Sequence, residues 1–199
     1  MNRHRPVLLE VTRPIRTARL VLRPFRRDDL PDLLAIESDP GVARYLYRGV
    51  RDEARAAQSL ETKMRATRIR PDGGALSLAV VLGDHGPVVG DLTLTYRSPV
   101  HRQAEIGYAL APAYHGHGLA TEAAAAAVDL AFDGLRAHRV YARIDPRNRA
   151  SARVLEKLGM RREAHLVESE RVKGEWTDEV VYALLHREWA ARRRGDGRP

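Results

Sequence analysis

The feature that most constrains this chain is a glycine-rich segment, Ala111–Leu119, between a predicted strand and a predicted helix. The apolar strand pattern ends at Leu110, and strong helix formers begin at Ala120. A helix N-terminus offers unpaired backbone N–H groups and a partial positive charge. Gly116 and Gly118 allow the backbone to turn sharply and to approach a bulky anion. The order strand, glycine loop, helix therefore predicts a cradle for a pyrophosphate group.

The same loop argues against the two common nucleotide-binding motifs. It lacks the Gly-Lys-Ser/Thr ending of a triphosphate loop, and no Gly-x-Gly-x-x-Gly sequence occurs in the chain. His115 and His117 lie in the loop without a matched third ligand, so we expect no metal site. A glycine loop alone is weak evidence for a ligand, and a plain tight turn is the alternative. The flanking residues must decide between the two.

Length and composition indicate a soluble protein with one domain of ordinary size. The chain has 199 residues, of which 44% are hydrophobic and 30% are charged, which is enough apolar material for a core. No apolar run reaches the roughly 18 residues expected of a transmembrane helix. The absence of cysteine excludes disulfides, thiolate nucleophiles and cysteine-ligated metal sites. We therefore expect a cytoplasmic location.

The formal net charge of +8 favours a polyanionic partner, such as nucleic acid, a membrane surface or a phosphorylated cofactor. Part of this charge lies at the chain ends. Residues 1–16 are interpreted as a flexible arm and residues 191–199 as a flexible basic tail, around a domain that spans residues 17–190. No aromatic interleaving or known motif supports nucleic acid as the main ligand. We attribute the charge mainly to solubility and cofactor attraction, and expect no membrane partner.

Apolar patterns predict one sheet with helices packed on it. Strands are expected over residues 18–25, 75–82, 88–96, 103–110, 140–144, 167–172 and 180–185. Helices are expected over residues 28–36, 51–69, 120–132 and 150–158, with a last helical turn over 188–194. Asp39-Pro40-Gly41 should end the first helix, and Lys173-Gly174 should form a turn. This order predicts a mixed α/β fold, antiparallel in its first half, with a strand–helix–strand crossover in its second half.

Several short sequences occur in a fixed order: Thr17–Phe25, Gln103–Leu110, the glycine loop, Ala120–Ala123, Asn148–Ser151 and Leu155–Met160. This combination resembles the GNAT superfamily of N-acetyltransferases, and most closely its RimJ/RimL-type branch. The resemblance covers residues 17–189, and the ordered set is more specific than any one piece. It implies a central, mostly antiparallel twisted sheet of six or seven strands, splayed at a cofactor cleft and flanked by about four helices. It also implies acetyl-CoA as the cofactor.

In that family the loop pattern is Gln/Arg-x-x-Gly-x-Gly/Ala, which falls on His115, Gly118 and Ala120. Since His115 replaces the usual Gln or Arg, the resemblance implies a cradle formed mainly by backbone N–H groups. The pantetheine arm would lie where residues 108–110 splay from residues 140–144. Arg153 and Lys157 either reach the adenosine phosphates or form a solvated basic helix face. The implied cofactor-binding residues are Tyr108, Ala109, Leu110, His115, Gly116, His117, Gly118, Leu119, Ala120, Thr121, Asn148, Arg153 and Lys157.

Acetyl transfer needs a free amine, an oxyanion donor and a proton for the leaving thiolate. The backbone N–H near Leu110 is the donor implied by the resemblance. Glu105 is the candidate base, and its alternative is a salt-bridged strand residue. Ser151 is the candidate acid, and the alternative for Ser151 and for Asn148 before it is a helix cap, since Asn and Ser are favoured N-cap residues. Leu155 stands where many relatives have a tyrosine, so Tyr108 or water remains a further proton donor.

The acceptor amine is the least determined part. The RimJ/RimL-type branch acetylates protein N-termini, which we take as the expected acceptor, whereas other relatives modify polyamines, aminoglycosides and other small amines. A non-catalytic acyl-CoA-binding module is a separate alternative, and a homodimer is left open. The acceptor side would be formed by the first two helices and the late hairpin, with Glu37, Tyr45, Glu168 and Trp176 as candidates and Tyr47 and Glu170 beside them.

Overall fold

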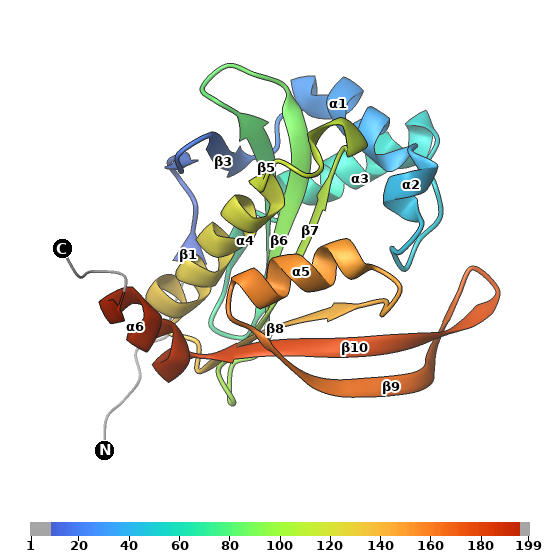
Figure 1. Ribbon diagram of the computed structural model, residues 1–199. Coiled ribbons are helices and arrows are strands. Elements are labelled where there is room, and N and C mark those ends of the chain that lie inside the picture. Colours follow the sequence, from blue (N-terminus) through green and yellow to red (C-terminus); the bar gives the residue numbers. More distant parts are fainter. Residues whose placement is uncertain (1–8, 196–199) are drawn as a thin grey trace.

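The computed structural model describes residues 9–195, and an eight-stranded sheet forms its centre (Figure 1). The strand order is β2-β3-β5-β6-β7-β8-β10-β9, and all neighbours are antiparallel except the parallel pair β7 and β8. The mixed α/β fold is confirmed, with eight strands instead of six or seven. The strands are β2 (Ile15–Arg16), β3 (Leu20–Pro24), β5 (Gly74–Leu82), β6 (Val88–Ser98), β7 (Gln103–Leu110), β8 (Arg139–Ile144), β9 (Arg161–Val172) and β10 (Glu175–Leu185).

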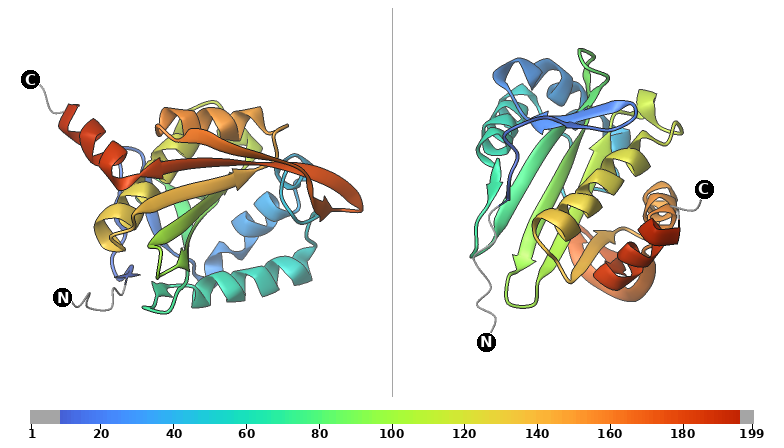
Figure 2. Two further views of the ribbon diagram at one scale, coloured as in Figure 1. Left: turned by 90° about the horizontal axis from the view of Figure 1, so that it is seen from below. Right: turned by 90° about the vertical axis from the view of Figure 1, so that its left-hand side faces the viewer.

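Helices cover both faces of the sheet. In Figure 2, α4 and α5 lie on one side of the sheet, and α1 and α3 lie on the other. Among the described residues, no helix is both long enough and apolar enough to cross a membrane. The helices are α1 (Leu30–Glu37), α2 (Pro40–Ala43), α3 (Glu53–Arg65), α4 (Leu119–Asp129), α5 (Arg149–Lys157) and α6 (His186–Gly195), with a 3-10 turn η1 (Arg27–Asp29) before α1, a second one η2 (Pro112–Tyr114) before α4 and a π-helical turn η3 (Leu130–Gly134) after it.

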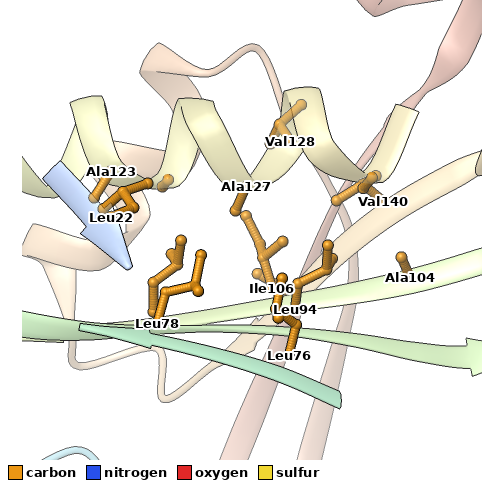
Figure 3. Packing of buried hydrophobic residues seen from close by; sticks show 14 of the residues in the cluster. Leu22, Leu76, Leu78, Leu94, Ala104, Ile106, Ala123, Ala127, Val128 and Val140 are labelled. Atoms are coloured by element: carbon orange, nitrogen blue, oxygen red, sulfur yellow. The ribbon is translucent and has the colours of Figure 1, made fainter. Parts of the chain in front are cut away.

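The two-sided core follows from the alternation of side chains along a strand. In β5, Leu76 and Leu78 pack in the cluster on the α4 side, whereas Ala79 and Val81 pack in the cluster on the α1 and α3 side. Helix α4 approaches the sheet through small residues such as Ala127, which is fully buried (Figure 3). Because alanine adds little volume, α4 sits close to the sheet, and its N-terminus is held at the end of β7.

One predicted helix boundary is wrong, and one short helix was not predicted. Asp39-Pro40-Gly41 does follow the end of α1, but the Asp39 side chain accepts a hydrogen bond from Val42 N (2.8 Å) and begins α2. An N-cap aspartate followed by proline is a helix start as well as a stop. The second helix ends at Arg65 and not at Ile69, because Ile69 is fully buried in β4 (Arg68–Ile69), which pairs with β1 (Leu9–Glu10).

Both expected terminal segments are partly regular structure. Residues 9–16, assigned to a flexible arm, contain β1 and β2, and Val11 between them is buried. Residues 191–195, assigned to a basic tail, belong to α6. Residues 1–8 and 196–199 lie outside the described part. The final hairpin has the expected turn at Lys173-Gly174, but β9 and β10 begin earlier than predicted, at Arg161 and Glu175.

Candidate active site

The parallel strands β7 and β8 separate part-way along their length. Their pairing covers three residues of each strand and ends at Glu105 and Tyr141. At the far end of β7, Ala111 donates its N–H to a carbonyl of β6 (2.8 Å), which sets the alternation of the ladder. The backbone polar groups of Tyr108 and Leu110 therefore point away from β6, toward the gap. The structure thus contains the splay expected beside residues 108–110, and its edge carries backbone donors and acceptors.

The glycine loop connects this splayed strand to α4. Gly116 and Gly118 have φ values of +80° and +78°, in the left-handed region that favours glycine, and Gly118 is the N-cap of α4. The first N–H within α4 to find a helical partner is that of Glu122, which donates to Gly118 O (3.1 Å). The backbone N–H groups before it face outward, as at any helix start. These groups belong to Leu119, Ala120 and Thr121.

His115 does not extend from the loop toward an anion site. Its Nε2 lies 2.8 Å from Leu110 O, so the imidazole donates from Nε2 back to the end of β7. This bond satisfies the Leu110 carbonyl and leaves the Leu110 N–H available in the gap. The residue that departs from the usual Gln or Arg therefore shapes the strand end.

A cavity of about 230 Å³, which we call the gap cavity, lies between the splayed strands and brings several predicted residues together. The Tyr108 hydroxyl is 2.9 Å from Ser151 Oγ, across the gap from β7 to α5. Burial raises the pKa of Tyr108, and the Ser151 hydrogen bond opposes that rise. Asn148 caps α5 by accepting from Ser151 N (3.0 Å), so the capping role of Asn148 is present. The gap cavity is also lined by Tyr45, Tyr47 and Glu105.

The carboxylates of the gap are ion-paired. Glu105 binds Arg97 (2.6 Å) and Arg143 (3.1 Å), which is the salt-bridged alternative considered for this residue. Arg143 also lies 3.5 Å from Glu179, a residue of β10 that is only 3% exposed. Tyr47 donates to Glu179 (2.5 Å), and burial together with this hydrogen bond raises the pKa of Tyr47. Glu105 and Glu179 therefore both face the Arg143 guanidinium group.

This arrangement of splayed strands, glycine loop and helix start agrees with the family comparison. A sequence model for the acetyltransferase (GNAT) domain matches residues 19–161. The chain belongs to the GNAT acetyltransferases. The family and the class of reaction expected from the sequence are thereby confirmed.

Individual GNAT relatives cover most of the chain. YnaD of Bacillus subtilis, named an uncharacterized N-acetyltransferase, is 33% identical over 88% of this chain and 98% of its own. The spermidine N(1)-acetyltransferase of Escherichia coli K12 is 26% identical over 88% of this chain and 91% of its own. A GNAT-family acetyltransferase structure from Bacillus anthracis has a TM-score of 0.79 and 31% identity, covering 88% and 100% of the two chains. Mycobacterium smegmatis RimJ, in complex with CoA-disulfide, has a TM-score of 0.73 and 26% identity, covering 97% and 96%.

Sequence reasoning missed the residues that brace the GNAT glycine loop. Arg19, just before β3, donates to His117 O (2.8 Å) and forms an ion pair with Glu122 (2.8 Å). Thr17 and the Arg19 backbone N–H also donate to Glu122. Burial alone would raise the pKa of Glu122, but these hydrogen bonds outweigh it and hold the pKa below its ordinary value. No local pattern links residues about a hundred positions apart, so only the fold reveals this clamp.

The remaining predicted GNAT site residues are spread out. Arg153 and Lys157 lie exposed on α5. Glu37 is buried in a second, larger cavity on the α3 side of the sheet. Glu168 and Trp176 line neither cavity; both are exposed on the β9–β10 hairpin, with Trp176 62% exposed. Arg143 also lines the gap cavity, and Glu179 contacts Arg143 and Tyr47 of its wall; the sequence patterns indicated neither residue.

Proposed function

We propose that this GNAT acetyltransferase binds acetyl-CoA along the glycine loop and the β7–β8 gap and transfers the acetyl group directly to the α-amine of a peptide N-terminus. The observation that carries the proposal is the Tyr108–Ser151 hydrogen bond at the point where β7 and β8 have separated. Transfer forms a carbon–nitrogen bond and breaks a carbon–sulfur bond. The amine nitrogen loses one proton and the thiolate sulfur gains one.

Binding of the cofactor rests on backbone groups. The outward N–H groups at the start of α4, together with the left-handed turns at Gly116 and Gly118, suit a pyrophosphate. The free edge of β7 at Tyr108 suits the amides of a pantetheine arm, which would pair with it as an added strand does. Asn148 uses its oxygen as a cap, so its NH₂ group is left to hold this arm. Acetyl-CoA bound in this way supplies the acetyl group as a thioester.

Tyr108 is the proton donor in this proposal, and Ser151 orients its hydroxyl. The Tyr108 phenol is neutral at physiological pH, and burial raises its pKa further, so its proton is present when the thiolate leaves. Leu155, which stands where many relatives have a tyrosine, is fully buried in the core and has no hydroxyl to offer. The Leu110 N–H points into the gap, while His115 binds the carbonyl of the same residue, and this N–H is the proposed oxyanion donor.

The paired carboxylates support an α-amine as acceptor. Glu105 and Glu179 each face Arg143, so both carboxylates are engaged by guanidinium donors. An α-amine has a pKa of about 8, against about 10.4 for a lysine-type amine, so far more of it is free base near neutral pH. We therefore assign Glu105 a positioning role and let water accept the amine proton. Relatives named for spermidine and for RimJ are equally distant in identity and do not choose between acceptors.

Release of free CoA thiol tests this proposal. We expect release from acetyl-CoA with a short peptide, and none above hydrolysis with the same peptide blocked at its N-terminus. The rate constant kcat/KM should rise with pH and level off near about pH 8, the pKa of the α-amine. Spermidine or an aminoglycoside acting faster than the peptide near neutral pH would replace the peptide acceptor. The absence of release with every amine would contradict the transfer reaction itself.

A further inference from the structure

The second cavity, which we call the α3-side cavity, is lined by residues of α3 and of β5, β6 and β7. Figure 2 shows α3 on the side of the sheet opposite α4 and α5. The α3-side cavity has a volume of about 690 Å³ and shares Gly107 and Tyr108 with the gap cavity. Tyr108 is therefore reached from both faces of the sheet. If the cofactor lies along the glycine loop on the α4 side, the open approach for an amine is from this α3-side cavity, where the rest of the acceptor would be held.

The walls of the α3-side cavity carry an excess of positive charge. Two acidic residues, Glu37 and Asp91, face four basic ones, which are Arg48, Arg51, Arg55 and Lys63. Lys63 is ion-paired with Asp91. The charge of a polyamine would meet repulsion from these walls, whereas an anion would meet attraction.

Glu37 cannot neutralise the arginines that surround it. Its carboxylate is only 2% exposed and is bound by Arg51 (3.0 Å), by Arg48 (3.5 Å) and by the Ser59 hydroxyl (2.9 Å). One carboxylate thus serves two guanidinium groups. The Arg48 side chain is 24% exposed, and burial lowers its pKa although the Glu37 carboxylate acts to raise it. The predicted acceptor residue Glu37 therefore acts as an anchor for basic side chains.

Arg55 is an exposed residue of α3 that lines the cavity and adds a further positive charge. Across residues 9–195, no carboxylate lies within ion-pair distance of its guanidinium group. Arg48 and Arg55 both line the cavity, one from the segment after α2 and one from α3. A guanidinium group binds carboxylates through paired N–H donors, so these two residues suit a carboxylate held at a distance from the amine.

We propose that the acceptor is an α-amine whose own molecule also carries a side-chain carboxylate, and that Arg48 and Arg55 bind this side-chain carboxylate in the α3-side cavity. The inference rests on the proposed N-terminal acetyl transfer and narrows it to peptides with an acidic side chain near the N-terminus. A free acidic amino acid shares the same chemistry. A cationic acceptor such as spermidine is excluded by the same charges.

The test compares matched acceptors with one another, in reactions that contain the full chain and acetyl-CoA. Three peptides differ only in Asp, Asn or Lys at the second position, and glutamate is compared with glutamine as a free amino acid. We expect kcat/KM for the Asp peptide to exceed that of the Asn peptide by about tenfold, with the Lys peptide slower still. Glutamate outpacing all peptides would assign the small-molecule source. Equal or higher rates for the Asn or Lys peptide, or for spermidine, would overturn the inference while leaving acetyl transfer intact.

Variants of α3 separate binding of the carboxylate from loss of structure. Arg55→Gln should reduce the Asp-over-Asn preference to near unity through KM, and Arg55→Glu should reverse it in favour of the Lys peptide. Arg65 lies on the same helix, is 82% exposed and is absent from the cavity wall, so Arg65→Gln is the matched control. An unchanged preference in Arg55→Gln and Arg48→Gln, with folding verified by circular dichroism, would contradict the assignment.

Discussion

The Tyr108 hydroxyl and Ser151 Oγ are 2.9 Å apart although 43 positions separate the two residues in the sequence. Tyr108 lies on β7 and Ser151 in the first turn of α5, so α4 and β8 intervene along the chain. The crossover through α4 brings β8 beside β7 in parallel, and α5 then returns over the gap. A strand and a helix start thereby place two hydroxyl groups where the strands have separated.

Tyr108→Phe should lower kcat by about two orders of magnitude with little effect on the KM for acetyl-CoA, because only a proton donor is removed. Ser151→Ala should have a smaller effect, about tenfold, since Tyr108 keeps its phenol. Initial-rate kinetics of thiol release measures both values. Tyr182→Phe is the control, because its hydroxyl contacts Glu156 and lines neither cavity. A full kcat in Tyr108→Phe would remove Tyr108 from the proposed chemistry.

His115→Ala should weaken acetyl-CoA binding by up to about tenfold, because the Leu110 carbonyl loses its hydrogen bond and competes for the strand edge. His115→Gln should restore much of the affinity, since a glutamine amide can donate to the same oxygen. Isothermal titration with CoA measures the change. His85→Ala, in the exposed β5–β6 turn, is the control. Equal affinity in His115→Ala and wild type would show that the strand end does not depend on this contact.

Gly118→Val should abolish CoA binding because a branched side chain is strained at a φ of +78° and the helix start must rearrange. The site is otherwise open, since a Cβ added at Gly118 would meet only Arg19 Nη2, at 3.5 Å, so backbone strain is the expected cause. Gly174→Val, at a φ of +90° in the β9–β10 turn, imposes a similar strain far from the loop. If both variants lose similar stability but only Gly118→Val loses CoA binding, the result supports the glycine loop as the pyrophosphate site. CoA binding that is retained in Gly118→Val would refute this assignment.

Glu122→Gln should destabilise the chain at neutral pH by about 1–2 kcal/mol, because the bonds from Thr17 and Arg19 lose their ionic character; the half-exposed Arg19 keeps the loss modest. The folded pKa of Glu122 is below its ordinary value of 4.5. The carboxylate therefore contributes fully above that value, and its contribution disappears as the pH falls through the lower folded pKa. Urea unfolding at several pH values should show that the difference in free energy of unfolding between wild type and Glu122→Gln decreases below about pH 4.5. A difference that stays constant with pH would contradict this assignment.

Local sequence was sufficient for the parts of the site that one segment builds. The strand Gln103–Leu110 was predicted with its observed bounds, because apolar alternation is a property of consecutive residues. The α4 start and the cap at Asn148 follow in the same way from glycine and capping preferences over a few residues. The family resemblance added the splay, which periodicity does not contain.

Tertiary structure alone decided what those segments contact. The sequence could offer Glu105 as a base, but only the order of strands places Arg97 and Arg143 against it. In the sequence Glu37 is one polar residue at the end of a predicted helix, and only the tertiary structure shows that it is buried among arginines. Backbone conformation is set largely by neighbours along the chain, so the glycine loop and helix start of the proposed cofactor site could be predicted from the sequence. Ion pairs and cavity walls join residues that are far apart in the sequence, and their approach depends on sheet order and helix packing. The charge of the α3-side cavity could therefore not be predicted from the sequence.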